Sequence, residues 1–78
     1  MDSIKYQQVA IGKRISALRM AKGMTQEQLA SVLNVSPAAV SKWERNLATP
    51  SVELLWALAD FFDCSIDELV GRKSAQIE

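Results

Sequence analysis

Apolar residues recur along the chain at helical spacing, and no segment alternates with period two for long enough to make a convincing strand. Ile11, Ile15 and Leu18 lie at positions i, i+4 and i+7, which predicts one apolar stripe on a helix from about Gln7 to Lys22. Gly23 follows at a position typical of a helix end, because glycine has no Cβ and adopts the left-handed conformation easily. The pattern therefore predicts an all-α protein.

Capping residues predict a second and a third helix. Thr25 and Gln28 fit a capping box, in which the threonine hydroxyl accepts from the Gln28 amide and the Gln28 side chain reaches back. Asn34 ends the second helix, because asparagine tolerates a positive φ angle. Ser36 caps the third helix and Pro37 takes its first position, where no amide hydrogen is needed. A connection of about three residues forces a sharp crossing, the geometry of a helix-turn-helix.

Two further helices follow towards the C-terminus. Ser51 is the expected cap of a helix that ends near Phe62 and is apolar over more than half its circumference. Such a helix is either central in the fold or partly covered by a second chain. Ser65 and Glu68 fit another capping box, which starts a short fifth helix that Gly71 closes.

The third helix has an inner and an outer side. Val35, Val40 and Trp43 are expected to anchor it to the core. The residues left pointing outwards are Pro37, Ala38, Ser41, Lys42 and Arg45. An exposed stripe that lacks Glu and Asp suits the approach of phosphate groups.

The charges of the chain are balanced in number and uneven in position. The 78 residues form one small domain, and nine basic and nine acidic residues give a net charge of zero. Residues 1–23 hold five basic and one acidic residue, a net of +4; residues 24–50 balance; residues 51–78 hold two basic and six acidic residues, a net of −4. Nucleic acid would therefore bind to a local patch, with modest and salt-sensitive affinity.

Composition leaves little material for catalysis or metal binding. There is no histidine and one cysteine, Cys64, which excludes an intramolecular disulfide, a Cys/His zinc site and a Ser–His catalytic pair. Asp60, Asp63 and Asp67 are spaced i, i+3 and i+7, but we expect them to straddle a helix end rather than hold a metal. No glycine-rich loop is present to cradle a phosphate, so we predict no enzyme and no cofactor.

The sequence predicts no membrane segment. No apolar run approaches the ~20 residues that a membrane span needs. Residues 1–10 lack the apolar region of a signal peptide, and a disulfide framework is missing. We therefore expect a cytoplasmic protein without a membrane partner.

Several short motifs stand in one order along the chain. They are Thr25-Gln26-Glu27-Gln28-Leu29-Ala30, Asn34-Val35-Ser36, Val40-Ser41-Lys42-Trp43-Glu44-Arg45-Asn46, Pro50-Ser51 and the stretch from Leu58 to Leu69. Together they resemble the lambda-repressor-like (XRE, Cro-type) helix-turn-helix family. The resemblance covers residues 8–71, with 1–7 and 72–78 as short terminal extensions. It implies an all-α, five-helix DNA-binding domain whose second and third helices form the helix-turn-helix.

This resemblance implies a base-reading face on the third helix, which the family docks in the major groove of DNA. The base-facing positions are Ser36, Pro37, Ala38, Ser41 and Lys42. Lys42 is the best direct reader, because its ammonium group can donate to guanine N7 and O6. Pro37 and Ala38 are short where the family often has Gln or Arg, so part of the specificity is expected from DNA shape.

The resemblance also implies phosphate contacts and one ion pair. The phosphate candidates are Arg14, Thr25, Gln26, Arg45 and Asn46. Thr25 and Gln26 lie at the start of the second helix, where free amides and the helix dipole favour an anion. The alternatives are a pure cap for Thr25, a capping or surface role for Gln26, and a solvated side chain for Lys42. Arg19 and Glu44 are expected to pair between the first and third helices, with a phosphate contact as the alternative for Arg19.

The function that the resemblance implies is sequence-specific regulation of transcription, usually repression, by a homodimer on a pseudo-palindromic operator. The candidates for the dimer interface are Ile66, Leu69, Leu54 and Phe61. Trp56 and Cys64 occupy positions that the family usually fills with aliphatic residues, so we expect both to pack in the core. The alternatives are an antitoxin-type protein that binds a partner protein and represses its own operon, and a restriction–modification controller within the regulator class.

Overall fold

The computed structural model describes residues 11–70, which form five helices and no strand. The helices are α1 (Ile11–Ala21), α2 (Gln26–Leu33), α3 (Pro37–Glu44), α4 (Val52–Phe62) and α5 (Ile66–Leu69). The all-α, five-helix prediction is therefore confirmed. The predicted start of the first helix at Gln7, the closing role of Gly71 and both terminal extensions lie outside the described residues.

The helix starts follow the capping residues that the sequence indicated. Thr25 and Ser65 form complete capping boxes with Gln28 and Glu68, and each serine or threonine hydroxyl accepts from the backbone amide three residues on. Ser36 and Ser51 cap α3 and α4 in the same way. These four local bonds satisfy amides that the first turn of a helix leaves without a partner.

Left-handed residues end two of the helices and follow two others. Asn34 closes α2 with φ of 60°, and Asp63 closes α4 with φ of 57°. Gly23 after α1 has φ of 69°, as predicted, and Asn46 after α3 has φ of 60°. Asparagine and aspartate tolerate this conformation better than other residues with a Cβ, which is why the chain can reverse there without glycine.

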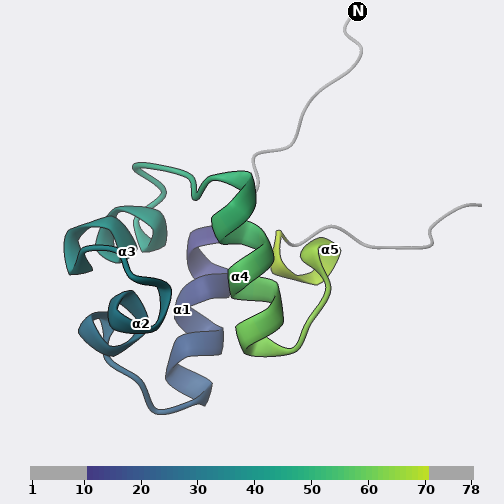
Figure 1. The fold of residues 1–78 in the computed structure, drawn as a ribbon, viewed down its shortest axis with the longest axis horizontal. Coiled ribbons are helices and arrows are strands. Elements are labelled where there is room, and N and C mark those ends of the chain that lie inside the picture. The colour runs from purple at the N-terminus through teal and green to yellow at the C-terminus, as the bar shows by residue number, and fades with distance from the viewer. Residues whose placement is uncertain (1–10, 71–78) are drawn as a thin grey trace, which may run out of the picture.

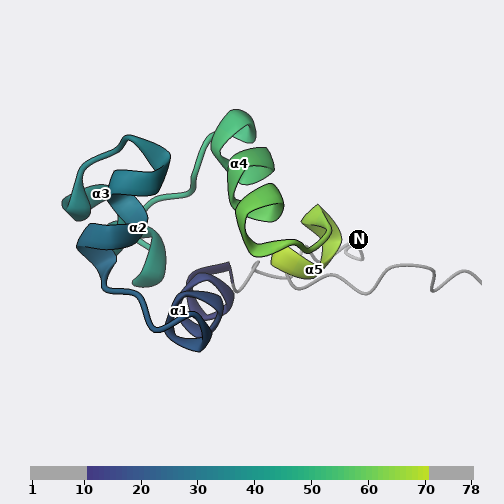
Figure 2. The ribbon, with the colours of Figure 1, turned by 60° about the horizontal axis from the view of Figure 1, so that its bottom comes forward.

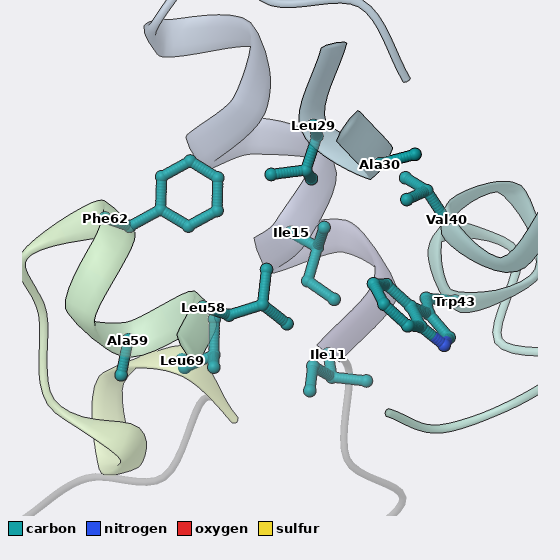
Figure 3. Packing of buried hydrophobic residues seen from close by; sticks show 10 residues of the cluster. All are labelled: Ile11, Ile15, Leu29, Ala30, Val40, Trp43, Leu58, Ala59, Phe62 and Leu69. Carbon is teal, nitrogen blue, oxygen red and sulfur yellow. The ribbon is translucent and has the colours of Figure 1, made fainter. Parts of the chain in front are cut away.

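The helices other than α1 form two groups. Figure 1 shows α2 and α3 together on one side and α4 with α5 on the other, and Figure 2 shows α1 lying along one side of both groups. The core contains buried apolar side chains from all five helices, and Figure 3 shows them around Ile15 and Leu58. They are Ile11, Ile15, Leu29, Ala30, Val40, Trp43, Leu58, Ala59, Phe62 and Leu69.

Two expectations about burial were wrong. Trp56 does not pack in the core, because it lies on the outer side of α4 and is 60% exposed, whereas the inner side of that helix presents Leu58, Ala59 and Phe62. Leu69 is not available as a dimer contact, because it is 0% exposed and forms part of the core. Cys64 is partly buried and packs against the core as expected.

Candidate nucleic-acid interface

A three-residue turn fixes the angle between α2 and α3. Asn34 takes the left-handed conformation, the amide of Val35 donates to the carbonyl of Ala30 over 3.0 Å, and Ser36 begins the next helix. Val40 and Trp43 then bury the inner side of α3 against the core. The turn and the two anchors together hold α3 as a rigid rod with one side in solvent.

The outer side of α3 carries the residues that the sequence predicted to face DNA bases. Exposed there are Ser36, Pro37, Ala38 and Lys42, and Ser41 is partly exposed. The Ser36 hydroxyl accepts from the amide of Ala39 over 3.1 Å, so its oxygen caps the helix and its hydroxyl hydrogen stays free to donate. Arg45 donates from Nε to Oγ of Ser41 over 3.3 Å, which brings those two side chains together on one face.

The single carboxylate of α3 turns away from this face. Arg19 on α1 donates from Nε to Oε2 of Glu44 over 2.6 Å and from Nη2 to Oε1 over 3.0 Å. The third donor, Nη1 of Arg19, reaches the carbonyl of Met24 over 2.6 Å. With the Arg19 side chain 13% exposed and that of Glu44 7% exposed, this is a nearly buried bidentate pair. The geometry is the structural ion pair that we predicted between the first and third helices.

Gln26 joins the same network. Its side-chain Nε2 donates to Oε1 of Glu44 over 3.0 Å, which ties the start of α2 to the end of α3. Sequence reasoning weighed a phosphate contact against a capping or surface role and missed this bond, because the two residues are 18 apart along the chain. Arg19, Gln26 and Glu44 therefore act as one unit that links three helices.

The network sets the protonation of its charged members. Burial alone would raise the pKa of Glu44, but the hydrogen bonds from Arg19 and Gln26 and the nearby positive charge outweigh burial, so the pKa of Glu44 is lowered. The hydrogen bond to Glu44 raises the pKa of Arg19 against the opposing effect of burial. Both residues are therefore charged at neutral pH.

The other phosphate candidates lie in different surroundings. Thr25 is exposed and forms the cap of α2, as one of its two predicted roles requires. Arg14 is exposed on α1. Asn46 accepts from the amide of Gly12 over 3.1 Å through its Oδ1, which leaves its Nδ2 as the donor that could face a phosphate. The structure therefore assigns Thr25 and Asn46 structural bonds in addition to any contact with DNA.

The fold separates the charges into two halves of the molecule. Residues 11–50, which contain α1, α2 and α3, hold six basic residues and two acidic ones, a net of +4. Residues 51–70, which contain α4 and α5, hold five acidic residues and no basic one, a net of −5. The net positive charge comes from α1 and its C-terminal end, because residues 24–50 balance. A polyanion is therefore attracted by the part of the molecule that contains α1 and repelled by the α4–α5 side.

Other kinds of site find little support in the part of the chain that is described. Between residues 11 and 70, no three His, Cys, Asp or Glu side chains are grouped to hold a metal ion. Over the same stretch, none of the helices combines the length and the apolar character that crossing a membrane requires. Burial raises the pKa of the Cys64 thiol, with further contributions from nearby carboxylates, and a protonated thiol is a poor nucleophile.

These features define a helix-turn-helix domain, and comparison with known proteins gives the same class. A helix-turn-helix family model matches residues 15–69. The transcriptional activator BcrR of Enterococcus faecalis is 45% identical over 59 residues, 76% of this chain and 29% of that protein. The uncharacterized HTH-type transcriptional regulator YazB of Bacillus subtilis is 40% identical over 58 residues, 74% of this chain and 84% of that protein.

Solved structures agree with the sequence comparison. The c2 repressor of Salmonella phage P22, crystallised in complex with a synthetic operator, has a TM-score of 0.75 at 36% identity, over 81% of this chain and 96% of that chain. The chain therefore belongs to the lambda-repressor-like (XRE, Cro-type) helix-turn-helix family. It spans half or less of the length of several curated relatives that it matches, BcrR included.

Proposed function

We propose that this chain is a sequence-specific, double-stranded-DNA-binding transcriptional regulator that docks α3 in the major groove. The observation that carries the proposal is the outer face of α3. It offers hydroxyl, ammonium and guanidinium donors in solvent, while Glu44, its one carboxylate, is held against α1. The similar P22 c2 repressor was crystallised with operator DNA, which supports the same use of this face.

Base reading is assigned to the first two turns of α3. Lys42 donates to guanine N7 and O6, and Ser41 and Ser36 offer hydroxyls to a base edge or a phosphate. Ala38 packs against a thymine methyl group, and Pro37 contributes shape only. With so few long polar side chains, part of the discrimination comes from the sequence-dependent shape of DNA.

Phosphate contacts flank the reading face. Gln26 and Thr25 present the start of α2 to one phosphate, because the free amides and dipole of a helix N-terminus favour an anion. The bond from Gln26 to Glu44 supports this role by holding the amide beside α3. Arg14, Arg45 and Nδ2 of Asn46 supply the remaining donors.

The proposal includes a homodimer that represses transcription from a pseudo-palindromic operator. One domain of this size buries little DNA, so two copies on adjacent half-sites are needed for useful affinity. Ile66 on α5 and Leu54 on α4 are partly exposed and are the candidates for the contact. Phe61 is a weaker candidate, because Nζ of Lys22 lies 5.2 Å from the centre of its ring.

The proposal also covers catalysis, cofactors, cellular location and a second candidate function. Curated relatives of this chain are named as transcriptional regulators, so we assign it neither a catalytic activity nor a cofactor. We also propose that the chain acts in the cytoplasm, where a bacterial regulator meets its DNA. The second candidate function, an antitoxin-type protein that also binds a partner protein, is favoured by one observation, the exposed Trp56 on α4.

Selection from a randomised duplex DNA pool tests the proposal directly. The purified chain is incubated with the pool near physiological salt, and the retained DNA is sequenced. We expect an inverted repeat whose half-sites lie about one helical turn apart, roughly 34 Å. No enrichment of any sequence, or retention of all sequences alike, would contradict the proposal.

A further inference from the structure

The outer face of α4 carries an apolar pair that the fold leaves in solvent. Val52 is 62% exposed and Trp56 is 60% exposed, and residues four apart on a helix lie one above the other. The inner side of α4 already contributes Leu58, Ala59 and Phe62 to the core. The exposed pair therefore adds nothing to the core, although a large aromatic side chain is costly to leave in water.

Carboxylates flank this apolar pair. Glu53 and Asp60, three residues before and four after Trp56, are both exposed on α4. They belong to the acidic half of the molecule, where residues 51–70 contain no Lys or Arg. We call the surface formed by Val52, Glu53, Trp56 and Asp60 the α4 patch.

The charge of the α4 patch selects among possible occupants. DNA and anionic lipid surfaces are repelled by the carboxylates. A second copy is disfavoured, because a two-fold axis brings the same surface of both copies together and would gather the Glu53 and Asp60 carboxylates of both copies in one interface. A positively charged partner is attracted by two interactions: its cation can pair with the carboxylates, and it can also stack on the indole of Trp56.

We propose that the α4 patch binds a segment of another protein in which an apolar side chain is flanked by Lys or Arg. The apolar side chain packs between Val52 and Trp56, and the basic side chains reach Glu53 and Asp60. The patch lies on a different helix from the base-reading face of α3, and Figure 2 shows these two helices in separate groups. The chain can therefore hold DNA and this partner by separate surfaces.

A random peptide library displayed on phage tests the proposal, with the full chain as bait and the Trp56→Ser chain used to remove peptides that bind elsewhere. We expect the enriched peptides to combine an aromatic or aliphatic residue with at least two nearby Lys or Arg residues. A synthetic peptide with the consensus sequence, labelled for fluorescence anisotropy, should bind the Trp56→Ser chain about tenfold or more weakly than the natural chain.

Matched variants distinguish the contribution of the carboxylates from that of the apolar contact with Trp56. The Glu53→Gln, Asp60→Asn double variant should weaken peptide binding severalfold and remove most of its salt dependence. Met20→Ser is the control, because Met20 is also 60% exposed but lies on α1, and it should leave peptide binding unchanged. DNA selection by the Trp56→Ser chain should match that of the natural chain, so failure of the partner site and failure of DNA binding are distinguishable.

Other results would overturn the proposal. Enriched peptides that lack basic residues would contradict the proposed partner chemistry. Peptide affinity that does not depend on Trp56 would show that the peptides bind outside the α4 patch. A dimer in sedimentation experiments that Trp56→Ser dissociates would make a second copy the occupant. The remaining alternative is that the chain covers the patch itself, and acrylamide quenching of tryptophan fluorescence tests this. The Trp56→Phe chain retains only the buried Trp43, so the difference between it and the natural chain gives the exposure of Trp56. A protected Trp56 in the free, dilute chain would mean that the chain covers its own patch.

Discussion

The backbone amide of Gly12 on α1 donates a hydrogen bond to Oδ1 of Asn46, which follows α3 in the left-handed conformation. The two elements approach closely at this point. A Cβ atom on Gly12 would lie 2.6 Å from the carbonyl oxygens of both Trp43 and Glu44, and 2.8 Å from Oδ1 of Asn46. The end of α3 is therefore seated directly on the backbone of α1, beside the ion pair between Arg19 and Glu44.

Gly12→Ala should destabilise the fold. In an open helix position alanine is favoured over glycine by about 1 kcal/mol. Here the added methyl group meets two backbone carbonyls that cannot rotate away, and overpacking of this kind costs typically 1–3 kcal/mol. We expect the free energy of unfolding, measured by urea denaturation, to fall by about 2 kcal/mol.

Gly23→Ala is the matched control for this prediction. A Cβ at Gly23 meets nothing within 4 Å, but φ is 69°, so the cost is conformational strain of about 1 kcal/mol. Gly12→Ala should also weaken DNA binding, because Gly12 supports the end of α3, whereas Gly23→Ala should leave DNA binding unchanged. A Gly12→Ala chain as stable as the natural protein would contradict the close approach of α1 and α3.

Glu44→Gln should destabilise the protein by leaving the charge of Arg19 without its partner in a nearly buried site. Loss of one member of a buried pair costs about 3–5 kcal/mol, and the lower end applies here because Arg19 retains some exposure and its bond to the Met24 carbonyl. Urea denaturation at neutral pH gives the value.

Removing both charges distinguishes the contribution of the ion pair from that of side-chain packing at the same site. Arg19→Met with Glu44→Leu keeps similar volumes without a charge, and such replacements are often neutral or stabilising. We therefore expect the double variant to be more stable than Glu44→Gln alone. If the double variant loses as much as the sum of its single variants, the ion pair is not the unit that holds α1 to α3.

Acid should weaken the fold through Glu44. Its pKa is lowered in the folded protein, so the unfolded chain takes up a proton first as the pH falls. The stabilisation from this residue is complete above the pKa of an unfolded glutamate, about 4.3, and is lost as the pH drops through the lower folded value. Urea denaturation between pH 7 and pH 3 should show the stability difference between the natural chain and Glu44→Gln shrinking over this window. A constant difference would exclude Glu44 as the titrating group.

Lys42→Ala and Arg14→Ala should affect DNA binding in different ways. Loss of a base contact by Lys42 costs about 1–3 kcal/mol and relaxes the preference at one position of the selected operator. Loss of a phosphate contact by Arg14 weakens binding to all sequences alike and lowers the slope of log K against log salt by about 1. Binding isotherms on the operator and its single-base variants, at several salt concentrations, distinguish the two. Uniform weakening by Lys42→Ala would reassign Lys42 to the phosphates.

The starts of α2 to α5 and the turn from α2 into α3 were predictable from the residue types alone. The capping bonds of Thr25, Ser36 and Ser65 join atoms three residues apart, and the left-handed turn at Asn34 depends on one residue's own conformational preference. Such features need only neighbouring residues, so the residue types reveal them. The pairing of Arg19 with Glu44 was available as well, but through the family resemblance rather than through local rules.

Which faces of the helices meet depends on contacts between residues that are far apart along the chain. The seat of Asn46 on Gly12 joins residues 34 apart, and the bond from Gln26 to Glu44 joins residues 18 apart, so no local pattern contains either contact. A glycine beside the apolar stripe of the first helix was the one signal that a close approach left in the sequence. The burial of Leu69 and the exposure of Trp56 depend in the same way on how α4 and α5 rotate against the core. Hydrophobicity says that a side chain gains by burial, but the packing of the other helices decides which apolar side chains find a place inside.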